Sequence, residues 1–277
     1  MSKRRETLLR LVQDETGRIL DVKVEQQPVL EPTPTPDPKT PLTVIELKPD
    51  TKTTALYTLS EGVVVDWGDG TKSVVNALDV ERGAIRHTYA TSATSNRVVT
   101  IDGEIDRTGR QERSVFDTSS LVAVRSLGTI RGSAWLLFSG CRSLTTIPKG
   151  LFDHCTALTS FADCFKECSA LTTIPEGLFD KLAAAESFNS CFYGCNKLKA
   201  IPSGLFDHCT KIYDLVDCFF ACTNLTGETP YTMVDGKKVP LWRRYEGNGF
   251  RRVRYGNFCF KGCTGLSDYA EIPDGWK

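Results

Sequence analysis

The sequence predicts a mainly β protein that combines an N-terminal hairpin, a β-sandwich and a solenoid of repeated coils. Residues 42–106 are short β-branched runs separated by Asp, Gly and Ser, which is the pattern of a small sandwich. From about residue 120 onward, Cys and Phe recur every 27 residues, and a fixed period of this length is typical of a solenoid. The chain has 34 basic and 34 acidic side chains, and this zero net charge argues against a general nucleic-acid binder.

The first predicted element is an antiparallel hairpin within an N-terminal domain of residues 1–27. Alternating apolar residues precede and follow residues 14–17, where Gly17 supplies the positive φ that such a turn often needs. A lone hairpin is marginal in water, so this one is either frayed or docked on something. For a docked hairpin, the expected anchoring residues are Arg4, Arg5, Leu9, Leu11, Ile19 and Val22.

Residues 28–41 form a proline-rich linker with six prolines. Proline fixes φ and removes a backbone donor, so we expect an extended, semi-rigid spacer. At ~3.1 Å per residue the linker spans roughly 40 Å, which is enough to hold the hairpin away from a larger body. A ligand for a proline-recognition domain is the alternative.

The N-terminal residues do not have the pattern of an export signal. Arg10, Gln13 and Asp14 interrupt the apolar cluster, whereas a secretory signal has roughly 7–15 uninterrupted apolar residues. No run approaches the ~20 apolar residues of a membrane span, so we expect no membrane insertion. If the protein lies outside a cell, we expect it to leave by another route, such as lysis.

Three motifs within residues 42–110 resemble one known domain family. Residues 63–71 read VVVDWGDGT, residues 87–89 read HTY, and residues 99–101 read VTI. Together they resemble the WGDG, H-x-Y and closing V-x-I motifs of PKD (polycystic kidney disease) domains. The resemblance implies an immunoglobulin-like fold that serves as a spacer or a binding module.

The aspartates of the WGDG segment have two interpretations. Asp66 and Asp69 could form a metal-binding or acid pair. Aspartate side chains in such segments more often bond to their own turn backbone, which favours a turn role. Asp69 followed by Gly70 is also a hairpin signal, and Trp67 is expected to anchor the core.

The domain 115–277 is dominated by the repeat. One unit reads L-T-T-I-P-x-G-L-F-D-x-C-T-x-L-x-x-F-x-x-C-F-x-x-C, and a single coil of this kind buries its apolar side only by stacking. The unit resembles leucine-rich repeats, more narrowly the Cys-rich bacterial surface-antigen (BspA-like) type. Residues 259–276 resemble the cap on such arrays in gut Bacteroidales and their mobile elements. The resemblance implies a solenoid, so the expected fold class is mainly β with an α/β solenoid. We expect residues 158–161, 185–188 and 212–215 on its parallel-sheet side.

Eleven cysteines take fixed positions, as four C-x-x-x-C pairs and three single residues. Zinc sites would need thiolates from neighbouring coils, because each pair supplies only two ligands. Disulfides would need an oxidising compartment and would leave Cys141, Cys155 and Cys209 without partners in the pattern. Buried thiols that stack in ladders are the third alternative. Leu182, at the position of Cys155 and Cys209, favours it, because a site that accepts Leu is a packing site.

No catalytic constellation stands out in the sequence. His87, His154 and His208 are the only histidines, and the last two share one position in coils two levels apart. The aspartate of the L-F-D motif is typical of turns, and no nucleophile elbow, P-loop or H-E-x-x-H motif occurs. We therefore expect no enzyme, no cofactor and no metal.

One coil carries an insertion, because Cys222 and Cys263 are 41 residues apart whereas the other intervals are 27. Insertions in solenoids often lie on the binding face, and Arg and aromatic residues dominate binding hot spots. The alternative is a capping loop whose arginines are solvated or pair with acids. The expected partner-binding residues are Trp242, Arg243, Arg244, Tyr245, Phe250, Arg251, Arg252, Arg254 and Tyr255.

The domain order and the resemblances favour a structural and adhesive role. The expected function is a non-enzymatic protein on the surface of a virus particle that infects gut bacteria, as a head fibre or capsid decoration. Its N-terminus would bind a capsid or other virion protein, and its repeats would bind a host surface protein or glycan. Fibres are commonly oligomeric, so we expect a homo-oligomer. The alternative is a leucine-rich-repeat adhesin on a bacterial cell surface.

Overall fold

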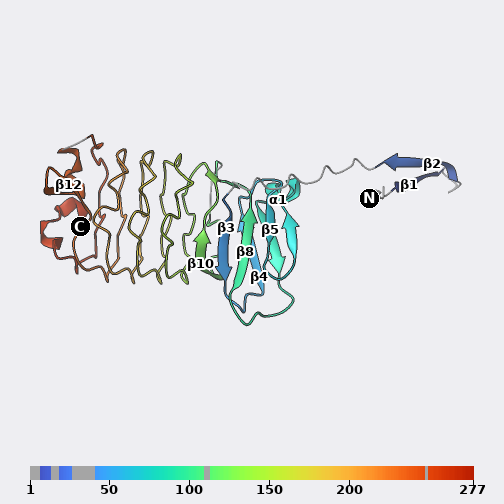
Figure 1. Cartoon of the computed structure of the whole chain (residues 1–277), viewed down its shortest axis with the longest axis horizontal. Helices are drawn as coiled ribbons and strands as arrows, with labels where there is room; N and C mark the ends of the chain where they lie inside the picture. The colour runs from blue at the N-terminus through green and yellow to red at the C-terminus, as the bar shows by residue number, and fades with distance from the viewer. Residues whose placement is uncertain (1–6, 14–18, 27–40, 109–112, 247–248) are drawn as a thin grey trace. The chain divides into compact units, whose positions relative to one another are not determined.

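The computed structural model describes residues 7–13, 19–26, 41–108, 113–246 and 249–277. The chain forms two compact units, Met1–Asp37 and Pro38–Lys277. In their described parts both units are mainly β, and helices are few (Figure 1). Within these residues, no helix is long and apolar enough to cross a membrane.

The first unit contains the hairpin predicted near the N-terminus. Strand β1 (Thr7–Gln13) pairs antiparallel with β2 (Ile19–Gln26), and the register places Leu9 opposite Val24. The four apolar residues of the expected anchoring set lie on these two strands. Arg4, Arg5, the hairpin turn and the proline linker up to residue 40 lie outside the described residues.

The second unit begins with a β region, residues 43–131. A five-stranded antiparallel sheet has the order β10–β3–β8–β5–β6, and β4–β7 and β9–β11 form two-stranded pairs, the latter parallel. Burial alternates along β3 and β8, as expected of a sheet with one face on a core. The bounds are β3 (Thr43–Leu47), β4 (Thr53–Tyr57), β5 (Val64–Asp66), β6 (Lys72–Val74), α1 (Ala77–Arg82), β7 (Ala84–Thr88), β8 (Arg97–Asp102), β9 (Ile105–Asp106), β10 (Leu121–Ser126) and β11 (Ile130–Arg131).

Strand β10 extends this sheet with residues that the sequence assigned to the solenoid. Its register pairs Leu121 with Leu47 and Val124 with Ile45. One buried apolar cluster runs from the β region to the C-terminus, so the core has no break at the predicted boundary between residues 110 and 115. The physical reason is that a stack of coils has an apolar end, which the β region covers.

Residues 134–266 form a coil stack, in which each coil lies against the next (Figure 1). Backbone N–H groups at fixed positions donate to carbonyls of the following coil, such as Phe138 to Cys164 and Phe165 to Cys191, both at 2.8 Å. Single parallel bridges join Ser160, Ser187, Asp214 and Tyr255 in successive coils, at the side predicted for the parallel sheet.

The described coils between residues 133 and 230 consist of turns without an α-helix, which differs from the expected α/β solenoid. The I-P-x-G segment of each unit explains the difference. Proline disfavours a helical conformation in the residue before it, and a glycine such as Gly150, with φ of 70°, ends helices rather than continuing them.

A column of stacked aromatic rings passes through the core of the coil stack. Neighbouring ring centroids are 5.2–5.6 Å apart, with 3–13° between ring planes. Because Phe138, Phe165, Phe192 and Phe219 occupy the same position in their coils, the 27-residue period becomes a ladder in space. The members are Phe116, Phe138, Phe165, Phe192, Phe219 and Phe260, and Trp276 closes the column at 6.4 Å.

All eleven cysteines are free and buried, as the ladder interpretation predicts. Four thiols donate to the carbonyl of a Phe in the preceding coil at 3.0–3.2 Å, namely those of Cys168, Cys195, Cys222 and Cys263. Burial raises the pKa of the Cys141 and Cys209 thiols to about 12. These cysteines therefore act as small apolar groups with a weak donor.

Residues 275–276 pair with residues 258–260 in the way that one coil pairs with the next. Phe258 N–H donates to Gly275 O at 3.0 Å, and Phe260 N–H donates to Trp276 O at 2.8 Å. Gly256 lies so close to Trp276 that a Cβ would stand 2.2 Å from the indole ring. The remaining elements are β12 (Tyr231–Val234), β13 (Lys237–Pro240), and the 3-10 helices η1 (Leu241–Glu246), η2 (Tyr269–Glu271) and η3 (Asp274–Trp276).

Candidate partner-binding surface

The insertion lies between two coils that remain paired. Tyr231 N–H donates to Ser203 O at 2.9 Å where the chain leaves the stack, and Leu215 N–H donates to Tyr255 O at 2.7 Å where it returns. Between these points the chain forms the hairpin β12–β13 and the helix η1. The inserted residues are therefore displayed without breaking the register of the ladder.

Part of the expected partner-binding set packs inside the protein. Arg244 is 3% exposed, its Nη2 donates to Phe206 O at 2.7 Å, and its guanidinium lies 4.0 Å from the ring centroid of Phe250. Burial lowers the pKa of Arg244 to about 10. Trp242 contacts Phe260 and Trp276 edge to face, with ring centroids 6.4 and 6.2 Å apart. Arg244 is thus buried, which corrects the expectation that it meets a partner. Trp242 is half-buried against the core, and its role in partner binding stays a prediction.

The outer part of the set forms an exposed arginine strip, which we define as Arg251, Arg252 and Arg254 with Tyr213 and Tyr255. The Arg251 guanidinium lies 4.5 Å from the centroid of the Tyr213 ring, and Arg254 lies 6.0 Å from that of Tyr255. The N–H groups of Arg254 and Tyr255 both donate to Tyr213 O, at 2.8 and 2.9 Å. Backbone bonds and ring contacts therefore hold the strip in place.

A shallow hollow of about 430 Å³ lies along this strip, lined by Tyr213, Arg251, Arg252, Val253 and Arg254. Glu186 approaches Arg251 at 3.8 Å, and both side chains are substantially exposed, so this ion pair is weak. Among the described residues no carboxylate pairs with Arg254. The hollow therefore presents positive charge beside aromatic surface, which suits an anionic group.

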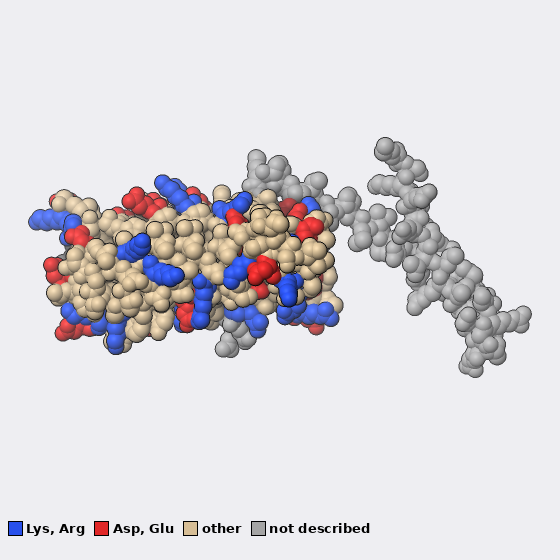
Figure 2. All heavy atoms as spheres, turned by 90° about the horizontal axis from the view of Figure 1, so that it is seen from below, with Lys and Arg blue, Asp and Glu red and all other residues tan. Residues whose placement is uncertain are grey.

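The remaining expected residues fall into neither group. Arg243 is exposed on η1, Phe250 is half-buried and covers the guanidinium of Arg244, and the side chain of Tyr245 lies outside the described residues. Figure 2 shows basic and acidic side chains interspersed over the face that it presents. A broad single-sign field, as a nucleic-acid interface requires, is absent from that face.

The WGDG segment forms a structural cluster with the H-x-Y motif. The ring of His87 stacks on that of Trp67 at 4.7 Å and 8°, and His87 Nε2 lies 2.8 Å from Asp69 Oδ2. Asp69 Oδ1 also accepts from Thr71 N–H at 3.0 Å. The hydrogen bond from the Thr71 hydroxyl contributes most to lowering the pKa of Asp69 to about 2. Asp66 accepts from Gly68 N–H at 3.0 Å. Both aspartates hold their own turns, as predicted.

Two titratable side chains of the repeat also lie against neighbouring turns. The carboxylate of Asp153 lies so close to Gly150 that a Cβ there would stand 2.7 Å from its Oδ2, and His208 Nε2 lies 4.0 Å from Asp180 Oδ1 in the preceding coil. Within the described residues, no group of three or more His, Cys, Asp or Glu side chains is arranged to hold a metal ion.

Two residues of structural importance escaped the sequence reasoning. Tyr213 breaks the repeat pattern, because Thr159 and Glu186 precede it at the same position, and this departure was a usable signal. Arg107 is 1% exposed and donates to Trp135 O across the junction of the β region and the first coil. The residues around it in the sequence form no pattern that predicts its burial. Burial lowers its pKa to about 10.

The known proteins add no family assignment. No protein-family model matches this chain, and no curated protein matches it.

Proposed function

We propose that this chain is a non-enzymatic structural and adhesion protein displayed on a bacteriophage particle, as a head fibre or capsid decoration. The N-terminal hairpin binds a capsid or other virion protein, and the arginine strip binds a surface protein or glycan of the host bacterium. The ring column from Phe116 to Trp276 carries the proposal. A continuous packed column makes the second unit stiff, which a display element needs.

The proposal includes a finer fold assignment. We assign the β region to the immunoglobulin-like PKD sandwiches, and the Trp67–His87 stack with the Tyr89 hydroxyl donating to Trp67 O supports this. We assign the coil stack to the Cys-rich bacterial leucine-rich-repeat solenoids. The fixed 27-residue period, the ring column and the buried thiol ladder support that assignment.

The non-enzymatic role rests on how polar side chains are used. The carboxylates of Asp66 and Asp69 are engaged by their own turns, and the buried Arg107 and Arg244 donate to backbone carbonyls. Catalysis needs a unique constellation of such groups, whereas the repeat presents the same residue types at each level. The proposal therefore includes no cofactor and no metal.

The host-binding part rests on the arginine strip. Its three arginines are exposed along a hollow, and the guanidinium groups of Arg251 and Arg254 lie over the rings of Tyr213 and Tyr255. Arginine and tyrosine are enriched in binding hot spots because they combine apolar area with directed donors. An acidic glycan or an acidic protein surface fits this chemistry. Several copies on one particle, as a homo-oligomer or as separate copies, would raise the avidity of such a weak site.

Immunogold labelling with an antibody against residues 38–277 tests the proposal. The antibody should decorate virus particles from cultures that make the protein, and a variant that lacks residues 1–27 should fold but leave particles unlabelled. Retention of this variant on particles would contradict the anchoring role. Label on intact cells before lysis, with none on particles, would instead support the bacterial cell-surface adhesin.

A further inference from the structure

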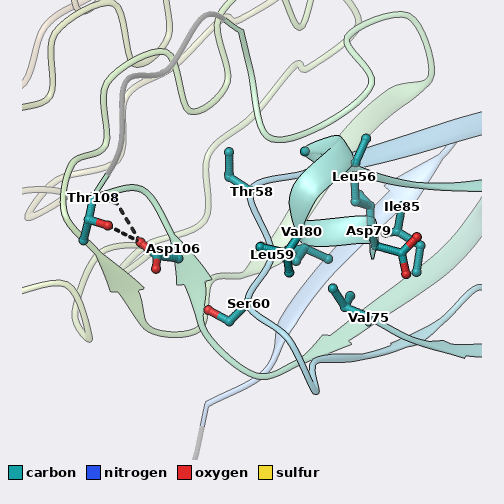
Figure 3. A pocket seen from close by; sticks show the side chains of 12 residues that line it. Leu56, Thr58, Leu59, Ser60, Val75, Asp79, Val80, Ile85, Asp106 and Thr108 are labelled. Carbon is teal, nitrogen blue, oxygen red and sulfur yellow. Dashed lines mark hydrogen bonds between the residues drawn. The ribbon is translucent and has the colours of Figure 1, made fainter. Parts of the chain in front are cut away.

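A hollow in the β region differs in its chemistry from the hollow along the arginine strip. It lies beneath α1, has a volume of about 250 Å³ and is lined by apolar residues such as Leu59 and Ile85 (Figure 3). Its lining also contains the carboxylates of Asp79 and Asp106 and no Lys or Arg, whereas the lining along the strip contains three arginines. An anionic ligand is therefore expected at the arginine strip.

The hollow along the arginine strip has the size of a small-ligand site. Its volume of about 430 Å³ falls within the roughly 300–1,000 Å³ of such sites. Apart from Val253 and the half-buried Tyr213, its lining is arginine, so it lacks the cluster of large apolar side chains at the centre of most protein interfaces. These features favour a compact polar ligand over a folded protein surface.

Two guanidinium groups of the strip are held in place before a ligand arrives. Arg251 lies over the ring of Tyr213 and Arg254 over that of Tyr255, and their N–H groups donate to Thr210 O and Tyr213 O, both at 2.8 Å. Less side-chain freedom is then lost on binding. Among the described residues no carboxylate pairs with Arg254, and one guanidinium matches one planar carboxylate in a bidentate pair.

The charges around the hollow have both signs, and this mixture decides the class of ligand. Lys211 is exposed and adds positive charge, whereas Glu186 lies 3.8 Å from Arg251, and Asp214 already accepts two local hydrogen bonds at 3.1 Å. A partner with carboxylates alone would be repelled by Glu186 and Asp214. A sugar acid suits the mixture, because its hydroxyl groups donate to a carboxylate while its own carboxylate accepts from an arginine.

We propose that this hollow binds a saccharide whose sugar rings each carry one carboxylate, as in a uronic acid. The carboxylate accepts hydrogen bonds from the Arg254 guanidinium, a ring hydroxyl donates to Glu186, and the apolar side of the sugar ring lies against Val253. This inference rests on the proposed function, because it names the ligand class of the arginine strip as an acidic glycan in preference to an acidic protein surface.

Isothermal titration calorimetry on the full chain tests the proposal with three probes. Trigalacturonic acid carries three carboxylates, acetyl-Asp-Asp-Asp-amide carries the same charge without sugar hydroxyls, and maltotriose is a neutral trisaccharide. Trigalacturonic acid should bind with a dissociation constant below about 1 mM, the peptide at least about tenfold more weakly, and maltotriose without saturation up to about 5 mM. A peptide that binds as tightly as trigalacturonic acid, or no saturable binding of trigalacturonic acid, overturns the proposal.

Variants of the protein place the ligand in the hollow. Arg254→Ser should weaken trigalacturonic acid at least about tenfold and Glu186→Ala about threefold, because each variant loses one contact. In a site for acidic peptides Glu186→Ala would instead strengthen binding, since it removes a negative charge. Both side chains are substantially exposed, so the melting temperature should not change. Arg86→Ser, at an exposed position on β7, is the matched control and should bind as wild type. Equal or tighter binding of trigalacturonic acid by Glu186→Ala also overturns the proposal.

Failure of this inference and failure of the proposed function give different results. If the arginine strip binds host cells but not trigalacturonic acid, the ligand class is wrong and the host contact stands. If trigalacturonic acid binds at the strip and a variant that lacks its three arginines still binds host cells, the ligand class stands and the proposed host contact is wrong.

Discussion

The ring of Phe116 stacks on the ring of Phe138, with 5.2 Å between centroids and 13° between planes. Phe116 belongs to the β region and Phe138 to the first coil, so the two parts share one column of rings. Arg107, which donates to Trp135 O, crosses the same junction. The β region thus serves as the cap of the coil stack, and the two should unfold together.

Replacing Phe138 by Ala should therefore destabilise the whole second unit. The side chain is fully buried between two stacked rings, and such a truncation costs about 3–5 kcal/mol. We expect one urea transition at a lower midpoint, followed by tryptophan fluorescence and by circular dichroism. Phe258→Ala, at a 43% exposed ring, is the control and should cost less than about 1 kcal/mol. Separate transitions for the β region and the coils would contradict the shared core.

Alkaline pH should destabilise the protein through its buried thiols. The pKa is raised by burial to about 11 for Cys155 and to about 12 for Cys141, Cys209 and Cys263. Above about pH 9 the unfolded chain loses thiol protons that the folded chain retains, so each such thiol lowers the free energy of unfolding by about 1.4 kcal/mol per pH unit. The melting temperature should be nearly constant from pH 7 to 8.5 and should fall steeply above pH 9.

Cys155→Leu is the matched variant for this effect, because Leu182 occupies the same position in the next coil. This variant should fold. Its free energy of unfolding should fall less steeply with rising pH than that of the wild type, because one buried thiol no longer contributes to the fall. A flat melting temperature up to pH 11 in the wild type would show that the thiols do not keep their protons in the folded state.

Acid should weaken the Asp69 cluster. The pKa of Asp69 is lowered to about 2, first by the hydrogen bond from the Thr71 hydroxyl and also by His87. Because the folded pKa is below the unfolded value, this contribution is present above about pH 4 and is lost as the pH falls towards 2. Asp69→Asn should remove this part of the pH dependence in acid unfolding curves. An unchanged curve between pH 4 and 2 in that variant would exclude the role.

The two kinds of arginine in the insertion should behave differently. Arg244→Ala removes one of the two donors to the carbonyl of Phe206, which keeps the Cys209 N–H at 3.0 Å, and opens a cavity beneath Phe250, at a cost of about 2–4 kcal/mol. Arg254→Ala removes an exposed side chain and should change the free energy of unfolding by less than about 0.5 kcal/mol. Chemical denaturation measures the free energy of unfolding of both variants. Equal losses would contradict the division into the buried Arg244 and the exposed Arg254.

The sequence was sufficient to predict the elements that follow from short-range or periodic patterns. The hairpin strands follow from alternation around Gly17, and the ladders follow from Cys and Phe at equal positions in each repeat. The turn roles of Asp66 and Asp69 follow from local side-chain-to-backbone bonds.

Long-range packing could not be predicted in the same way. Strand β10 joins the sheet because Leu121 and Val124 meet Leu47 and Ile45, which are more than 70 positions away. Arg244 is buried because a carbonyl in another coil accepts its donor, and nothing in its neighbours along the chain distinguishes it from Arg243. The burial of a charged side chain depends on which distant group pairs with it.

Binding of the purified protein to the host cell surface tests the central claim, that the arginine strip is the contact with the host. Wild type should bind cells of the host bacterium, and the variant Arg251→Ser, Arg252→Ser and Arg254→Ser should lose binding at least about tenfold with an unchanged melting temperature. Arg82→Ser, Arg86→Ser and Arg142→Ser together remove the same charge from exposed positions elsewhere and should bind as wild type. Equal binding of the two triple variants would contradict the account.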